Sequence, residues 1–268
     1  MPLDTSKAWS EATAMVSANK DVMAAIAGVF FFLPALALAL FFPQPEPPAG
    51  AQLREMMTML EGYYRQTAPY MLVATLVQVL GQLAVLTLAA RVGRATVGDA
   101  IRAAAGGLLP YLGAQALLLL AGAAVFGVIV LLAPLSSALA LLLGLAAAAA
   151  VVWISVRLVM VPVVIAIEGM RSPLAVLRRS WDLTRGSAGR ILLFLVVLGL
   201  AVTVIAVVAS AGIGILLALI GGVEAARIGG AAVSAAIGAG FAVYVALSLA
   251  AIHRQLAGSG HSDMAVFE

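Results

Sequence analysis

The sequence predicts an all-α integral membrane protein of six transmembrane helices, with amphipathic helices on one membrane surface. Of its residues, 64% are hydrophobic and only 10% are charged, whereas about a quarter of the residues in soluble domains are charged. Several apolar stretches exceed the roughly 18 residues that indicate a membrane-spanning helix. The basic residues gather between these stretches. We therefore interpret residues 1–268 as a single polytopic membrane domain.

The first apolar run, residues 22–42, is long enough to span a membrane, and Asp4, Glu11 and Asp21 precede it. A signal peptide has a basic start and a shorter apolar core of roughly 7–15 residues. We therefore expect a retained first helix. The six spans are predicted at approximately 22–42, 69–90, 107–132, 137–167, 190–221 and 229–252.

The basic residues outside the spans are divided unequally between the two sides. The side with both termini carries eleven: Lys7, Lys20, Arg91, Arg94, Arg102, Arg171, Arg178, Arg179, Arg185, Arg190 and Arg254. The other side carries three: Arg54, Arg65 and Arg227. Because short cytoplasmic loops are enriched in Lys and Arg, both termini are predicted to be cytoplasmic.

Two of the three predicted extracytoplasmic connections, 134–136 and 221–228, are short. The first is longer and begins with PQPEPPAG (43–50), which is too rich in proline for a helix. Residues 52–66 then place apolar side chains at helical spacing. This segment is interpreted as a helix lying in the outer interface, or as one whose methionines line a pocket for an acyl chain or a partner helix.

Three cytoplasmic amphipathic segments precede the odd-numbered spans, namely SKAWSEATAMVSANKD, TVGDAIRAAAGG and SPLAVLRRSWDLTRG. They align at Ala12, Ala100 and Ala175. This alignment indicates three repeats of a surface helix plus a helical hairpin, or a coincidence of alanine-rich composition.

Helix-end signals occur in two of these segments. Thr96 and Asp99 have the spacing of a capping box, with Asp in place of Glu. In the third segment, Ser172 suits an N-cap, Pro173 the first helical position and Gly186 the position after the helix. We expect Leu174, Leu177 and Trp181 to enter the interface while Arg178 and Arg179 face headgroups.

Arg157 is the most notable charge inside a predicted span. It is interpreted either as a ligand for an anion or lipid phosphate, or as a structural arginine that reaches the interface. A bend at Pro162 would bring it closer to Glu168, or it would pair with Asp182 of the next surface helix. The predicted lipid- or anion-binding residues are therefore Arg157, Arg178, Arg179, Trp181 and Arg185.

The other polar intramembrane candidates are Gln78, Gln82, Gln115 and Glu168. The three amides would line a polar path or form hydrogen bonds between helices. Gly230, Ser234 and Gly238 permit close packing of the last span on an internal helix or on a second copy of the chain.

The sequence contains none of the common motifs of catalytic, metal-binding or phosphate-binding sites. The chain has no cysteine, HExxH, GxSxG or glycine-rich phosphate loop, and His253 and His261 follow the last predicted span. We therefore predict no catalytic residue, metal or cofactor. The sequence pI of about 9.6 indicates contact with anionic lipid rather than nucleic acid, because the basic residues lie at helix ends.

The segment SPLAVLRRSWDLTRG, followed by GRILLFLVV and preceded by RLVMVPVVIAIEGM, resembles a known group. This group is the membrane domain found beside glycerophosphoryl diester phosphodiesterases, together with the related YciC-like bacterial inner-membrane proteins. NKDVMAAIAGVFFFLPAL and RVGRATVGDAI extend the resemblance. It implies a six-helix protein of the bacterial cytoplasmic membrane with no assigned reaction. The phosphodiesterase domain of the fused members has no counterpart here, so no catalytic residue carries over.

These observations together predict a non-catalytic inner-membrane protein that interacts with phospholipids, anionic ones in particular, or organises lipid- or envelope-related partners. Its protein partners would be further copies of itself or other membrane proteins. The alternative is a small transporter or channel with a polar path near Arg157, Gln78, Gln82 and Gln115.

Overall fold

The computed structural model describes residues 4–45, 48, 50–90, 96–132, 134 and 136–264, and all regular structure in these residues is helical. Arg91 and Arg94, which contribute to the predicted orientation, lie outside the described residues. Within these residues, five helical segments are long and apolar enough to cross a membrane: Lys20–Phe41, Leu53–Ala90, Val97–Leu132, Ala138–Ile167 and Ala188–Gly258. The chain is therefore an all-α, multi-pass membrane protein.

The chain begins with the surface helix α1 (Thr5–Ala18), whose N-cap Asp4 accepts a hydrogen bond from the Lys7 amide at 3.0 Å. The first span follows as α2 (Lys20–Ile26), the π-helical turn η1 (Ala27–Phe32) and α3 (Leu33–Phe41). On α1, Ala8 and Ala12 are fully buried. The Trp9 ring lies 4.7 Å from the Tyr244 ring of the last helix, so α1 is docked on the helical body.

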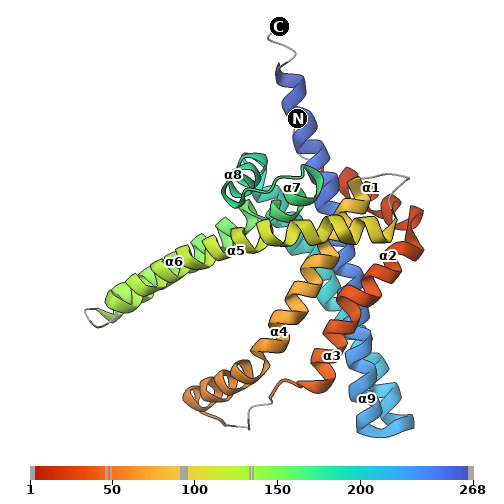
Figure 1. Ribbon diagram of the computed structural model, residues 1–268. Coiled ribbons are helices and arrows are strands. Elements are labelled where there is room, and N and C mark those ends of the chain that lie inside the picture. Colours follow the sequence, from red (N-terminus) through yellow and green to blue (C-terminus); the bar gives the residue numbers. More distant parts are fainter. Residues whose placement is uncertain are drawn as a thin grey trace.

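The predicted interfacial segment 52–66 and the second span form one helix, α4 (Leu53–Ala90), with Pro69 inside it. A separate surface helix was the expectation, so the boundary near residue 67 is wrong. Figure 1 shows the first part of α4, in brown, running in a different direction from its orange remainder. A proline inside a helix removes one backbone hydrogen bond and favours such a bend without ending the helix.

The second surface segment and the third predicted span also merge into one helix, α5 (Val97–Leu132). The predicted Thr96–Asp99 cap is confirmed, because the Asp99 amide donates to Thr96 Oγ1 at 3.2 Å and that hydroxyl donates to Asp99 Oδ2 at 2.7 Å. With α6 (Ser137–Arg157), α5 forms a hairpin that extends away from the other helices in Figure 1.

The fourth predicted span, 137–167, is interrupted near its end. The helix α6 stops at Arg157, residues 158–160 form a turn, and α7 (Val161–Ile167) follows. Pro162 lies in the first turn of α7, where its missing N–H is tolerated. The predicted bend at this proline is therefore present as a complete break just before it.

The predicted third surface helix is α8 (Pro173–Leu183), with Ser172 as N-cap and Pro173 as its first residue. The Ser172 side chain makes no cap hydrogen bond. Gly186 follows the helix end at φ +82°, the left-handed conformation that glycine adopts most easily. The three predicted repeats join their spans differently: α1 through Asn19, α5 without interruption, and α8 through turn residues 184–187. The triplication stays a prediction.

The final element, α9 (Ala188–Met264), turns back at Gly222, whose φ is +79°. Figure 1 shows the resulting light-blue hairpin. The reversal therefore lies within the expected connection 221–228, but the turn is shorter than predicted, because the residues after Gly222 are already helical. Ser210 and Ser234 Oγ atoms lie 2.8 Å apart across this hairpin, so part of the predicted small-residue face packs internally. A Cβ on Gly238 would meet open space.

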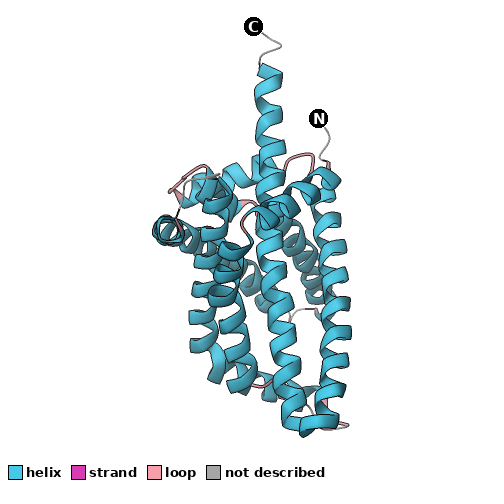
Figure 2. Cartoon of the chain, turned by 90° about the vertical axis from the view of Figure 1, so that its right-hand side faces the viewer, coloured by secondary structure: helices cyan, strands magenta, loops and turns pink. Residues whose placement is uncertain are grey.

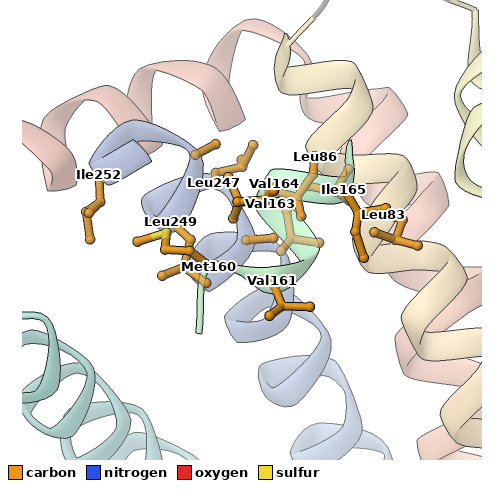
Figure 3. Packing of buried hydrophobic residues seen from close by; sticks show 14 of the residues in the cluster. Leu83, Leu86, Met160, Val161, Val163, Val164, Ile165, Leu247, Leu249 and Ile252 are labelled. Carbon is orange, nitrogen blue, oxygen red and sulfur yellow. The ribbon is translucent and has the colours of Figure 1, made fainter. Parts of the chain in front are cut away.

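The core lies where α4, α7 and α9 meet (Figure 3). Leu83 and Leu86 of α4, Val164 of α7, and Leu247 and Ile252 of α9 are almost completely buried there. Figure 2 places the start of α1 and the last turns of α9 at the same end of the molecule. The short helix α7 therefore lies inside this core. The polar connections at this end of the molecule pack around it.

Candidate functional site

Arg157, at the end of α6, packs against α8 rather than pairing with an acid. Its Nη1 donates to the Trp181 carbonyl at 3.3 Å, and its guanidinium lies 4.6 Å from the Trp181 ring centre and 5.6 Å from that of Trp153. Stacking of a guanidinium on aromatic faces is favourable. Among the described residues, neither Glu168 nor Asp182 forms an ion pair with Arg157, so the expected pairing is wrong. These contacts support the interpretation of Arg157 as a structural arginine rather than as a ligand for an anion or lipid phosphate.

The α8 helix also caps the C-terminus of α6. The Arg157 carbonyl accepts hydrogen bonds from Ser180 Oγ at 2.9 Å and Thr184 Oγ1 at 3.1 Å. The last carbonyls of a helix lack partners within it, and here the next surface helix supplies them. The buried hydroxyls of Ser180 in α8 and of Thr184 directly after it therefore hold the break between α6 and α7.

Replacing both Ser180 and Thr184, as Ser180→Ala with Thr184→Val, should loosen this junction. Each lost hydrogen bond is expected to cost about 1 kcal/mol, and the buried carbonyl becomes unsatisfied. Thermal unfolding of the purified protein in detergent should show a lower midpoint, with Ser187→Ala, in the turn after α8, as the control. A double variant as stable as the unmodified protein would contradict the capping role.

Glu168 joins three elements through two hydrogen-bonded pairs. It directly follows α7, and its carboxylate accepts from Arg179 Nε of α8 at 2.9 Å and from His253 Nε2 of α9 at 2.8 Å. Burial raises the pKa of Glu168, but the hydrogen bonds from Arg179 and His253 outweigh this and hold the pKa below its ordinary value. We refer to Glu168, Arg179 and His253 as the Glu168 cluster.

The cluster revises two sequence expectations. Arg179 was expected to face headgroups but is directed to Glu168, and Glu168 lies just beyond the end of its candidate span rather than within it. His253 was not selected as a site residue. Its place one residue after the last predicted span was a weak signal, because a histidine at a helix end more often faces solvent.

The exposed side of α8 carries the other predicted lipid-facing residues. Leu174, Arg178, Trp181 and Arg185 are exposed, whereas Val176, Ser180 and Leu183 are buried. Leu177 is half-buried and packs against the core, unlike the exposed Leu174 and Trp181, and its insertion into the interface stays a prediction. Lys, Arg, Trp and Leu are side chains that helices at a membrane surface commonly carry.

A large cleft lies between α5 and α6, close to α4. Its volume is about 800 Å³ and its lining is predominantly apolar. Polar groups in the lining come from Gln82, Tyr111, Gln115 and Ser155. Gln115 Nε2 donates to Tyr111 Oη at 2.9 Å, one helical turn away.

The four residues of the predicted polar path do not all meet. Gln82 and Gln115 line the α5–α6 cleft, whereas Gln78 and Arg157 do not. Tyr111 was missed from the sequence, although its i,i+4 spacing to Gln115 predicts a shared helix face. The cleft is therefore an apolar chamber with a few hydrogen-bonding groups rather than a charged channel.

The fold and these features define a helical multi-pass membrane protein with an apolar cleft between two candidate spans and an exposed basic helix face. Comparison of the chain with protein-family models, with curated proteins and with solved structures finds no match. The resemblance to the membrane domain of glycerophosphoryl diester phosphodiesterases therefore stays a prediction.

Proposed function

We propose that this chain is a non-catalytic protein of the bacterial cytoplasmic membrane that binds phospholipid, with an acyl chain lying in the α5–α6 cleft. Six crossings are proposed, the hairpin of α9 supplying two, with both termini in the cytoplasm. The predicted family resemblance, which links the chain to glycerophospholipid metabolism, supports this proposal.

The α5–α6 cleft is the observation that carries the proposal. Ligand sites commonly have volumes of roughly 300–1,000 Å³ and apolar walls with few polar groups, and this cleft of about 800 Å³ fits that description. It lies between two candidate spans, so hydrocarbon chains surround its entrance. Gln82 and Gln115 would supply amide donors for the ester carbonyls of a lipid.

The charge distribution favours anionic lipid at the same membrane side as the termini. Arg178 and Trp181 are exposed on α8, and Arg185 is exposed in the turn that follows it. A basic residue near an anionic leaflet contributes about 1 kcal/mol of attraction. Trp side chains are enriched at headgroup depth. This surface would hold α8 against the membrane while the cleft holds the chain of a lipid.

Filling the cleft tests the proposal. Ala148 lines the cleft and is exposed, whereas its neighbour Ala149 is exposed but does not line it. The variant Ala148→Phe should lose phospholipid that co-purifies with the protein, as measured by native mass spectrometry after delipidation and reloading. Ala149→Phe, which adds the same ring outside the cleft, should keep it.

Two outcomes would contradict lipid binding in the cleft. The first is an unmodified protein that retains no phospholipid after reloading, and the second is equal retention by Ala148→Phe and Ala149→Phe. Folding of both variants is checked by size-exclusion chromatography and circular dichroism, so that loss of lipid is separated from loss of structure.

A small transporter or channel is the second candidate. The observation that favours it is the presence of Gln82, Tyr111 and Gln115 in one chamber between candidate spans. Solute flux into proteoliposomes that decreases in Gln115→Leu while lipid retention is unchanged would favour transport. Absence of any flux for a panel of small polar solutes would leave lipid binding as the better account.

A further inference from the structure

A second pocket lies at the membrane boundary, where α4 and α7 end. Its volume is about 310 Å³, and its polar lining groups come from Thr87, Glu168 and Arg171. No residue lines both this pocket and the α5–α6 cleft. Leu83, Gly107 and Ile165 border it and pack closely, since a Cβ on Gly107 would lie 3.0 Å from Ile165. The two sites are therefore distinct.

Arg171 is positioned by a tight turn against small residues of α5. Gly169, at φ +69°, reverses the chain after α7. The Arg171 guanidinium then lies over Gly106, where a Cβ would be 3.4 Å from Nη1. Larger side chains at this point of α5 would displace it. The small residues Ala103, Ala104 and Gly107 form the adjacent wall of the pocket.

Opposite charges line this pocket without pairing with each other. Among the described residues, Arg171 forms no ion pair, and Glu168 pairs with Arg179 and His253 instead. A carboxylate offers about four acceptor positions, and these two partners do not fill all of them. The guanidinium of Arg171 keeps its donors available for an anion such as phosphate.

We propose that this pocket binds the phosphoethanolamine group, with the phosphate on Arg171 and the ammonium on Glu168. A ligand that carries one positive and one negative charge can pair with both Glu168 and Arg171. A simple anion would be repelled by the Glu168 carboxylate, and a simple cation would be repelled by Arg171. The location supports a lipid source, because the candidate spans end at Ala90 and Ile167, which line the pocket. This proposal concerns a different site from the acyl-chain cleft and does not depend on it.

The chemistry predicts a preference between headgroups. A primary ammonium donates hydrogen bonds to a carboxylate, whereas the trimethylammonium of choline has no N–H and is bulkier. A glycerol headgroup carries the phosphate but no positive charge to meet Glu168. We therefore expect ethanolamine to be preferred over choline and glycerol by about tenfold or more in affinity.

Binding is measured with the full chain in detergent and in nanodiscs. Isothermal titration with soluble glycerophosphoethanolamine, glycerophosphocholine and glycerophosphoglycerol tests the free headgroup. Native mass spectrometry of nanodiscs with the three corresponding diacyl lipids tests the membrane-bound headgroup. Ethanolamine selectivity in the first arm identifies a soluble ligand, and selectivity in the second arm alone identifies the lipid.

The variant Arg171→Gln should weaken binding of the ethanolamine compound about tenfold or more. Arg102→Gln, which removes the charge of an exposed α5 arginine outside the pocket lining, should leave it unchanged. Ala103→Leu, which narrows the pocket without a charge change, should also reduce binding. Equal affinity for ethanolamine and choline compounds, no binding in either arm, or full binding by Arg171→Gln would overturn the proposal. Lipid retention by Ala148→Phe reports separately on the cleft.

Discussion

Replacing Glu168 with alanine should destabilise the protein more than any other single removal of a charge. The change leaves His253 buried and Arg179 half-buried without their shared acceptor. The side chains of Arg179 and Glu168 are 40% and 21% exposed, so solvent reduces the cost below that of a fully buried pair. We expect a loss of about 1–3 kcal/mol, measured as a lower midpoint of thermal unfolding in detergent.

Glu224→Ala provides the control for the Glu168 prediction. Glu224 forms an ion pair of 2.7 Å with Arg227, but both side chains are substantially exposed. Its removal should therefore leave the midpoint unchanged. Equal effects of Glu168→Ala and Glu224→Ala would show that the Glu168 cluster does not hold α7, α8 and α9 together.

The Glu168 cluster also predicts the direction of a pH effect. Because the pKa of folded Glu168 lies below the ordinary value of 4.5, its contribution is fully present above about pH 4.5. It is lost as the pH falls through the lowered pKa of the folded state. The unmodified protein should therefore lose more thermal stability on acidification than Glu168→Gln, which has no carboxylate at this position. Parallel pH profiles would contradict this assignment.

Replacing Gly81 with alanine is expected to have the second large effect. A Cβ on Gly81 would overlap the Cβ of Phe30 and lie 3.2 Å from the ring of Phe31. The Phe30 Cβ is attached directly to the backbone of η1, so the first span and α4 must separate. Overpacking of this kind costs about 1–3 kcal/mol, and the variant should unfold at a lower temperature or yield less folded protein.

Gly62→Ala is the matched substitution in the same helix. A Cβ at Gly62 meets no atom within 4 Å. Since alanine favours helix over glycine by roughly 0.5–1 kcal/mol, Gly62→Ala should be neutral or slightly stabilising. A Gly81→Ala protein as stable as the unmodified one would indicate that η1 and α4 lie farther apart than in this structure.

The sequence by itself determined the features that depend on local chemistry. Long apolar runs predicted the membrane class and the approximate spans, because a bilayer core requires about 20 apolar residues per helix. The Thr96–Asp99 cap, the Pro173 start of α8 and the glycine after its end were also predicted correctly. Each of these involves residues within a few positions of one another.

Helix boundaries were less predictable, because hydropathy does not show whether a polar segment interrupts a helix or continues it. Residues 53–90 and 97–132 each form one helix, although their first turns are amphipathic. Conversely, the apolar run around Pro162 contains a complete break. The break is held by hydroxyl groups in and directly after α8 that are more than 20 residues away.

Only the tertiary structure decided which polar residues meet. Glu168 and His253 are 85 positions apart, yet they lie 2.8 Å from each other. Arg157 had two acids as candidate partners, but the packing of α8 placed Trp181 against it instead. Side-chain partners across helices depend on how those helices cross and rotate, and apolar periodicity in a membrane protein leaves that geometry open. The sequence therefore determined that this chain crosses a membrane, and the packing of α7, α8 and α9 decided where its charges lie.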